Sequence, residues 1–289
     1  MTQPTGDEIV RQAQREIDAR KLHAAEQRGI DERGWRIIFL GLLGGLLVAL
    51  VAWPGVPLSW KMYSVVHGVC AQIHNVDVGG IQLPLCARNT GIYASFSSTI
   101  IFLLLRGRGR ASKLPQLPIT VLLVLLAAVM GVDGLNSMAR DMLLPHMYTP
   151  MNWLRTLTGI GLGTGVAVIV LMIFNLALRR DVQSEQRIID GWGEFAAVIG
   201  CNLLVAIAIY ANIAASYWIV ATLAWGGIVG VLFVVMLLLT GLLMGYEGQV
   251  MRVGQLARPA TVALLLTLVI LGAMGFGRFY LESQGLMLS

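Results

Sequence analysis

Charged side chains are scarce in this sequence. Asp, Glu, Lys and Arg make up 13% of its 289 residues, whereas a soluble domain carries about 25%. Hydrophobic residues make up 56%, and the mean hydropathy is +0.73. So few polar side chains cannot cover a soluble protein of this size, and the bilayer must therefore be the partner of most of the chain. A net charge of +5 is expected at a membrane surface, so no nucleic-acid partner is predicted.

Several signatures of known chemistry are also missing. The three cysteines are too few for a fold built on disulfides. The chain has no Walker lysine motif, no dinucleotide glycine fingerprint, no HExxH and no Gly-x-Ser-x-Gly elbow. Its apolar stretches hold almost no carboxylates, which a coupled carrier usually needs. A polar segment over residues 1–36 precedes the first apolar stretch, and this is too long for a cleavable signal peptide.

Long apolar stretches are what the sequence does have. A transmembrane helix needs about 20 mostly apolar residues. Seven stretches qualify or come close, and they are residues 37–53, 91–105, 117–132, 156–178, 195–213, 217–244 and 259–279. We therefore predict an all-α integral membrane protein, a polytopic helical bundle with about seven transmembrane helices.

The basic residues predict the orientation of these helices. With the N-terminus in the cytoplasm, the cytoplasmic segments carry 16 Lys and Arg and the external segments carry 5. Basic residues concentrate in cytoplasmic loops, so the C-terminus is expected outside. The protein should thus be a multi-pass protein of the cell membrane, of the bacterial inner or plasma membrane type. The predicted organisation is a polar cytoplasmic helix (1–36), a four-helix region (37–178) with external loops at 54–90 and 133–155, and three further spans (179–289).

Two external segments concentrate the polar residues that chemistry would use. Residues 54–90 and 131–159 hold three of the four histidines, His67, His74 and His146. Because both segments are expected on one side of a compact bundle, we expect them to meet. Charges near span ends usually pair, so Asp133 is predicted to pair with Arg155 or Arg88, more as a structural ion pair than as a catalytic one.

One of these segments resembles a known family. The string Pro84-Leu-Cys-Ala-Arg-Asn-Thr-Gly-Ile-Tyr93, with His67, Cys70 and Gln72 before it, is similar to the signature of the DUF2085 family of predicted membrane proteins. The later Asp133-Gly134 and Arg155-x-x-Thr158-Gly159 fit the same pattern. The resemblance covers about residues 60–178. It departs at Ala71 and Asn89, where the family has His and Cys.

The resemblance and the charge pattern together give a candidate external site. Its residues are His67, Cys70, Gln72, Cys86, Arg88, Tyr93, Asp133, His146, Arg155 and Thr158. An oxidising outer face favours a disulfide between Cys70 and Cys86, which would contribute ~3 kcal/mol. Unpaired thiols are an alternative. The family's His and Cys set would suit a soft metal, so a metal site built from the remaining ligands is the third.

The function stays open at this point. A binding, accessory or scaffold subunit that holds a lipid, a quinone or a pigment, or a partner protein, fits the nearly uncharged spans best. The alternative is a membrane enzyme that acts on a lipid-linked substrate at the external face, where Arg side chains would hold a phosphate. A transporter is the third reading, supported only by the glycines at the start of the fourth span. No particular cofactor is indicated.

Overall fold

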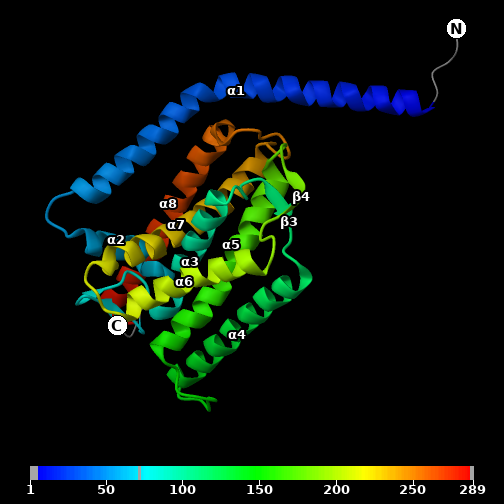
Figure 1. Cartoon of the computed structure of the whole chain (residues 1–289). Helices are drawn as coiled ribbons and strands as arrows, with labels where there is room; N and C mark the ends of the chain where they lie inside the picture. The colour runs from blue at the N-terminus through cyan, green and yellow to red at the C-terminus, as the bar shows by residue number, and fades with distance from the viewer. Residues whose placement is uncertain (1–5, 71–72, 287–289) are drawn as a thin grey trace, which may run out of the picture.

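The computed structural model describes residues 6–70 and 73–286, and these residues form a bundle of long helices (Figure 1). Six of the helices are long and apolar enough to cross a membrane. Their apolar segments are Glu32–Ala52 in α1 (Gly6–Ala52), α4 (Leu117–Asp141), α5 (Asn152–Leu178), α6 (Trp192–Tyr210), α7 (Ser216–Leu243), and Val253–Ser283, which includes α8 (Ala257–Ser283). The predicted all-α polytopic membrane bundle is therefore confirmed.

Helix α3 (Ala87–Leu105) occupies the middle of the bundle, although it is not among these six (Figure 1). It packs most extensively against α5, then against α7 and α6. Polar and small residues are frequent on it, and Ser95 and Thr99 are buried. Such residues lower the hydropathy of a helix but let neighbouring backbones approach closely. The predicted span over residues 91–105 thus exists as a helix that other helices surround.

Several helices extend past the ends that hydropathy predicts. Helix α4 continues from the predicted end at 132 to Asp141, and α5 begins at Asn152 rather than at 156. The added turns contain Asp133, Asn136 and Arg155, which are buried. Their side chains bond to other residues of the bundle: Asp133 to Arg88, Asn136 to the backbone of Tyr148, and Arg155 to Ser137. Polar residues therefore continue the helices where hydropathy alone predicts loops.

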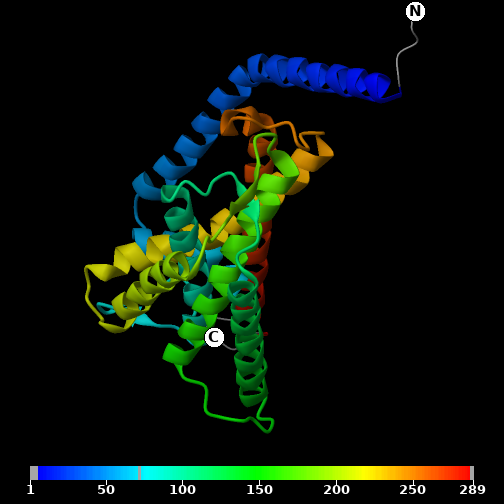
Figure 2. The same cartoon turned by 45° about the vertical axis from the view of Figure 1, so that its right-hand side comes forward.

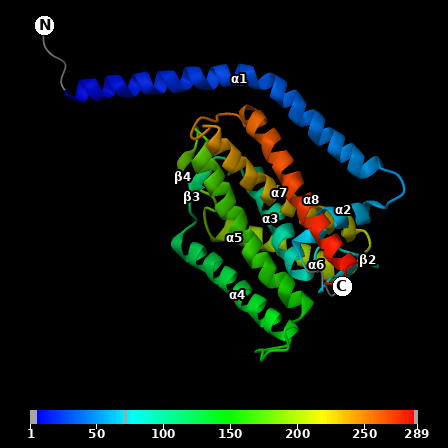
Figure 3. The same cartoon turned by 180° about the vertical axis from the view of Figure 1, so that it is seen from behind.

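Helix α1 lies at one side of the bundle and bends away from it. Its C-terminal half passes α8, and its N-terminal half projects beyond the other helices (Figures 1 and 3). The attachment point is Glu32, which is 2% exposed. The Tyr246 hydroxyl donates to its Oε1, and the backbone N–H of Arg258 donates to Oε2 at 2.9 Å. A carboxylate at the N-terminus of α8 is stabilised by the unpaired amides and the helix dipole there.

A small parallel sheet marks one end of the bundle, which we call the arginine end. Strand β3 (Ala111–Lys113) pairs with β4 (Gln183–Arg187) (Figure 2). Beside it, Glu194 accepts from Arg108 Nε at 3.1 Å and from Arg108 Nη2 at 3.0 Å. The basic stretch 106–114 therefore meets the segment 179–194.

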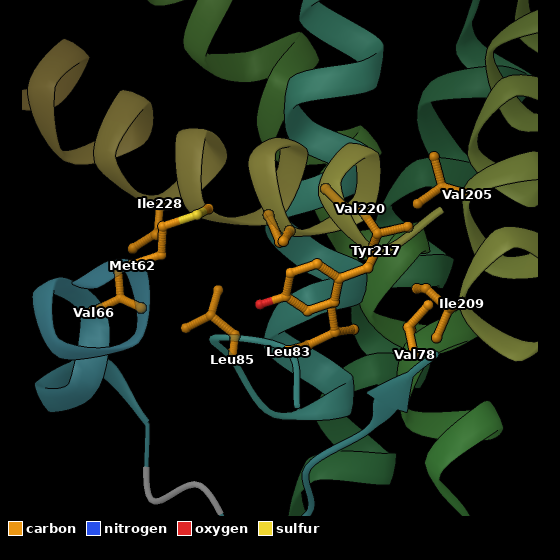
Figure 4. Close-up of a cluster of buried hydrophobic side chains, with 13 residues drawn as sticks. Met62, Val66, Val78, Leu83, Leu85, Val205, Ile209, Tyr217, Val220 and Ile228 are labelled. Carbon is orange, nitrogen blue, oxygen red and sulfur yellow. The ribbon is translucent and has the colours of Figure 1, made fainter. Parts of the chain in front are cut away.

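We call the opposite end the histidine end. It contains a cluster of buried apolar side chains, including Leu83, Leu85 and Tyr217, which we call the apolar anchor. Here α2 (Leu58–Val66), η1 (His67–Val69) and the hairpin of β1 (Asp77–Val78) with β2 (Ile81–Gln82) fold back onto α6 and α7. Figure 4 shows Leu83 and Leu85 beside the fully buried Tyr217. Burial of such side chains contributes about 1.5–3 kcal/mol each, which fixes the segment leading into α3.

Candidate functional site

Residues 84–93, which carry the family resemblance, connect the apolar anchor to α3 and form its first turns. Leu85 is fully buried, and Cys86 is the residue before the first turn of α3. The Thr90 hydroxyl donates to the Leu85 carbonyl oxygen at 3.1 Å. These contacts set the first turn of α3, so Arg88 extends from it toward α4.

Arg88 and Asp133 form the ion pair at the centre of a buried polar cluster. Arg88 Nη2 lies 2.6 Å from Asp133 Oδ2, and Asp133 is 1% exposed. The Tyr148 hydroxyl donates to Asp133 Oδ1 at 2.8 Å, and the Thr158 hydroxyl donates to Oδ2 at 3.4 Å. Of the two pairings predicted for Asp133, the structure contains the one with Arg88. Burial raises the pKa of Tyr148, and the hydrogen bond to the carboxylate raises it further.

Arg155 lies in the same cluster without a carboxylate of its own. Its Nη1 donates to Asn152 Oδ1 at 3.0 Å, and its Nε donates to Ser137 Oγ at 3.4 Å. Arg88 Nη2 also donates to Ser137 Oγ, at 2.8 Å. The two guanidinium groups are therefore neighbours. Ser137, Tyr148 and Asn152 were not predicted as site residues, because they belong to no sequence motif with a recognisable spacing.

His67 belongs to a second cluster, formed with the C-terminal part of α8. Its Nε2 lies 2.8 Å from Glu282 Oε2, and its ring stacks on Phe279 with centroids 4.2 Å apart. Arg278 bonds Glu282 Oε1 through Nε at 2.7 Å and donates to the carbonyl oxygen of Cys70. Figure 3 shows this end of α8 beside α2. Arg278 and Glu282 were missed, and their spacing of four residues in the last apolar stretch was the available signal.

The other predicted residues lie apart from these two clusters. His146 is exposed in the α4–α5 loop, where its Nδ1 lies 3.3 Å from the Leu144 carbonyl oxygen. Tyr93 packs against the apolar anchor instead of lining the Arg88 cluster. Gln72 is outside the described residues. His74 joins the two segments that were predicted to be external, because its Nε2 lies 3.2 Å from Asp141 Oδ2. The structure therefore brings residues 54–90 and 131–159 into contact.

The predicted disulfide between Cys70 and Cys86 is wrong. Both are free thiols, and they are not at disulfide distance. The two side chains nevertheless hydrogen-bond to each other. An oxidising compartment favours a bridge, but the bond also needs close and correctly oriented Cβ atoms, and the sequence does not report that geometry. Among residues 6–70 and 73–286, no three His, Cys, Asp or Glu side chains gather in a way that would hold a metal.

Cys86 is expected to react slowly with maleimide in the reduced protein. The hydrogen bond with Cys70, and then burial, raises the pKa of the Cys86 thiol well above its ordinary value. Maleimide reacts with the thiolate. Labelling should therefore keep accelerating through about pH 10, where an ordinary thiol of pKa about 8.5 has levelled off. Peptide mapping by mass spectrometry measures the rate.

The Cys70→Ala variant is the matched control for this labelling. It removes the largest cause of the raised pKa, so Cys86 should label at least about tenfold faster near pH 7.5, a change of one pKa unit. A levelling-off near pH 9 in the unaltered chain would contradict the raised pKa.

An apolar groove lies between α3, α5 and α7, toward the arginine end. Its volume is about 520 Å³, and its walls include Phe96, Ile100, Val170 and Phe174. At its polar end lies Asn175, which is fully buried. Asn175 Nδ2 donates to the Ala111 carbonyl oxygen at 2.7 Å, while its Oδ1 has no hydrogen-bond partner.

Comparison with known families places the central part of the chain. Residues 70–169 match the family model DUF2085, described as a predicted membrane protein. The resemblance carried by Pro84–Tyr93 is thus confirmed over this range, which contains the Arg88 cluster and part of the groove. No curated protein and no solved structure matches the chain.

The DUF2085 match begins at Cys70 and ends within α5. It includes Arg88, Asp133, Arg155 and Thr158, so the cluster lies wholly within the matched range. His67 precedes this range, and its partners Arg278 and Glu282 follow it. The second cluster therefore joins the matched region to the rest of the chain.

Proposed function

We propose that this protein binds an amphiphilic molecule, such as a lipid, an isoprenoid quinone or a related pigment, in the groove between α3, α5 and α7. The groove itself carries the proposal. Its volume of about 520 Å³ lies within the range of about 300–1,000 Å³ that small-molecule sites occupy. Walls of apolar side chains with a few polar groups at one end suit a ligand with a hydrocarbon body and a small head.

The polar end of the groove supports a head group that donates a hydrogen bond. Asn175 Oδ1 is buried and has no hydrogen-bond partner. A buried acceptor without a hydrogen bond costs about 1–3 kcal/mol. A hydroxyl or amine at the end of an apolar ligand would satisfy it. Arg179 lines the same end, and its Nε donates to Asp181 Oδ1 at 3.0 Å. Asp181 also pairs with Arg110 Nε at 3.0 Å, so the requirement for a donor head group rests on Asn175.

Two glycines of α7 allow the groove to be filled selectively. Gly226 and Gly230 line it, and a Cβ at either position would meet no atom within 4 Å. Leucine at either position would therefore begin in open space and extend its side chain into the groove. In a mild-detergent preparation, lipid extraction and mass spectrometry should find one apolar species that Gly226→Leu or Gly230→Leu reduces by about fivefold, as a loss of about 1 kcal/mol implies.

Gly200→Leu is the matched control, because a Cβ at Gly200 also meets nothing within 4 Å and this residue does not line the groove. This variant should keep its bound molecule. A preparation without any retained apolar species, or equal loss in the three variants, would overturn the proposal. Thermal unfolding of each variant checks that the fold is intact.

A further inference from the structure

We propose that Arg155, together with Arg88, binds a phosphate-type oxyanion at the histidine end, independently of the apolar groove. The basis is an imbalance of charge in the buried cluster. Asp133 pairs with Arg88, and within the part of the chain that the structure describes Arg155 is in no ion pair, although Asp141 and Asp133 act on its charge from a greater distance. Arg155 is 3% exposed. A buried charge is costly unless it is paired, so this arrangement lacks an anion.

Asp133 is engaged by donors other than the second arginine. Its Oδ2 accepts from Arg88 and Thr158, and its Oδ1 accepts from the Tyr148 hydroxyl. The partners of Arg155 are Ser137 and Asn152, which are neutral. The protein thus fixes the guanidinium group of Arg155 in place without neutralising it.

Unused donors indicate where an anion would bond. Arg155 Nη2 and Arg88 Nε are both buried and have no hydrogen-bond partner. The two groups are neighbours, because both arginines donate to Ser137 Oγ. A phosphate oxygen matches the planar fork of donors that a guanidinium presents. An anion held by both groups would satisfy these donors and relieve the repulsion between two like charges.

The surroundings of the cluster suit the phosphate of a lipid head group as well as a free phosphate. The Arg88 side chain is 22% exposed and gives the cluster its accessible edge. The adjoining α4–α5 loop exposes a row of apolar side chains, namely Met142, Leu143, Leu144, Met147 and Met151. Apolar side chains beside arginines are the pattern of a segment at the level of lipid head groups.

The test measures thermal unfolding of the whole protein in a zwitterionic, phosphate-free detergent. The probes are inorganic phosphate, dioctanoyl phosphatidic acid, and dioctanoyl glycerol as the neutral control. A ligand that binds only the folded state raises the unfolding temperature, and the rise grows with the ratio of ligand concentration to Kd. We expect a rise with phosphatidic acid that dioctanoyl glycerol does not give. A rise with inorganic phosphate as well assigns the site to the free anion, and a rise with the lipid alone assigns it to a head group.

Two variants tie the effect to Arg155. Arg155→Met removes the charge at similar volume, and should unfold no lower than the unaltered chain without probe, while losing at least about four-fifths of the probe-induced rise. Arg140→Met is the matched control. Arg140 lies in the last turn of α4, at the same end of the bundle as the cluster. It donates to the Pro150 carbonyl oxygen at 3.2 Å, so this variant should keep the rise.

Native mass spectrometry of the same samples counts the bound phosphate groups directly. The absence of a rise with either phosphate probe, or an undiminished rise in Arg155→Met, would overturn the proposal. So would an Arg155→Met variant that unfolds well below the unaltered chain without probe, because a structural role for the charge would then explain its burial. Loss of the groove ligand in the Gly230→Leu variant leaves these outcomes unchanged, since the groove lies toward the other end of α3 and α5.

Discussion

Replacing Gly163 with alanine is expected to abolish most of the folded protein. A Cβ at this position would lie 2.0 Å from the Ile92 carbonyl oxygen and 2.2 Å from Ser95 Oγ. The first of these atoms belongs to the backbone of α3, so relief requires the two helices to separate. Overpacking of a core costs about 1–3 kcal/mol even where side chains can adjust. Here the whole α3–α5 contact must move, so we expect at least about 3 kcal/mol.

Gly165→Ala is the control from the same helix, two residues further on. A Cβ there would have the Leu123 carbonyl oxygen as its nearest atom, at 4.0 Å. Alanine is favoured over glycine within a helix by about 1 kcal/mol, so this variant should be as stable as the unaltered chain or slightly more stable. Gel-filtration yield in detergent and the unfolding temperature distinguish the two variants. Equal behaviour of both would show that α3 and α5 do not touch as described.

Replacing Asp133 with asparagine should have the second large effect. The change keeps the shape of the side chain but removes the carboxylate that pairs with Arg88. Breaking a buried pair by removing one partner costs about 3–5 kcal/mol. Arg88→Met should also be strongly destabilising, because it leaves the buried carboxylate uncompensated. Thermal or denaturant unfolding in detergent measures both.

The double variant tests whether the two residues act as a pair. Arg88→Met with Asp133→Asn removes both charges, so it should be less destabilised than the sum of the two single changes. Additive losses would mean that the ion pair does not couple them. For comparison, Lys113→Met removes the exposed Lys113–Glu185 pair, which measures 2.7 Å. Pairs at the surface contribute little, so no measurable change in stability is expected there.

The sequence predicted the helices better than their ends. Apolar length is enough to find a membrane helix, because the bilayer demands it. It fails where a helix continues through polar residues, as α4 does to Asp141 and α5 does from Asn152. Those turns are stable because side chains from three helices satisfy one another, and such bonds between distant segments leave no periodic signal.

The sequence predicted which charged residues gather in the candidate site but not how they pair. A charged residue near a span end predicts a partner on the same side of the membrane, which brought Arg88, Asp133 and Arg155 together. Which arginine takes the carboxylate depends on the exact crossing of α3, α4 and α5, which spacing does not report. His67 found its partner 215 residues away, at Glu282. The apolar groove leaves no motif at all, since its walls read as ordinary membrane helix.

The central position of α3 has a consequence for how the chain enters the bilayer. Among the helices that the structure describes, α3 falls short of the apolar content of the six candidate spans, yet it packs extensively against α5 and α7. Lipid alone would be a poor solvent for its serines and threonines. It therefore gains a favourable surrounding only once α5 and α7, which follow it in the chain, have been made, so its commitment to the membrane should come after theirs instead of in the order of synthesis.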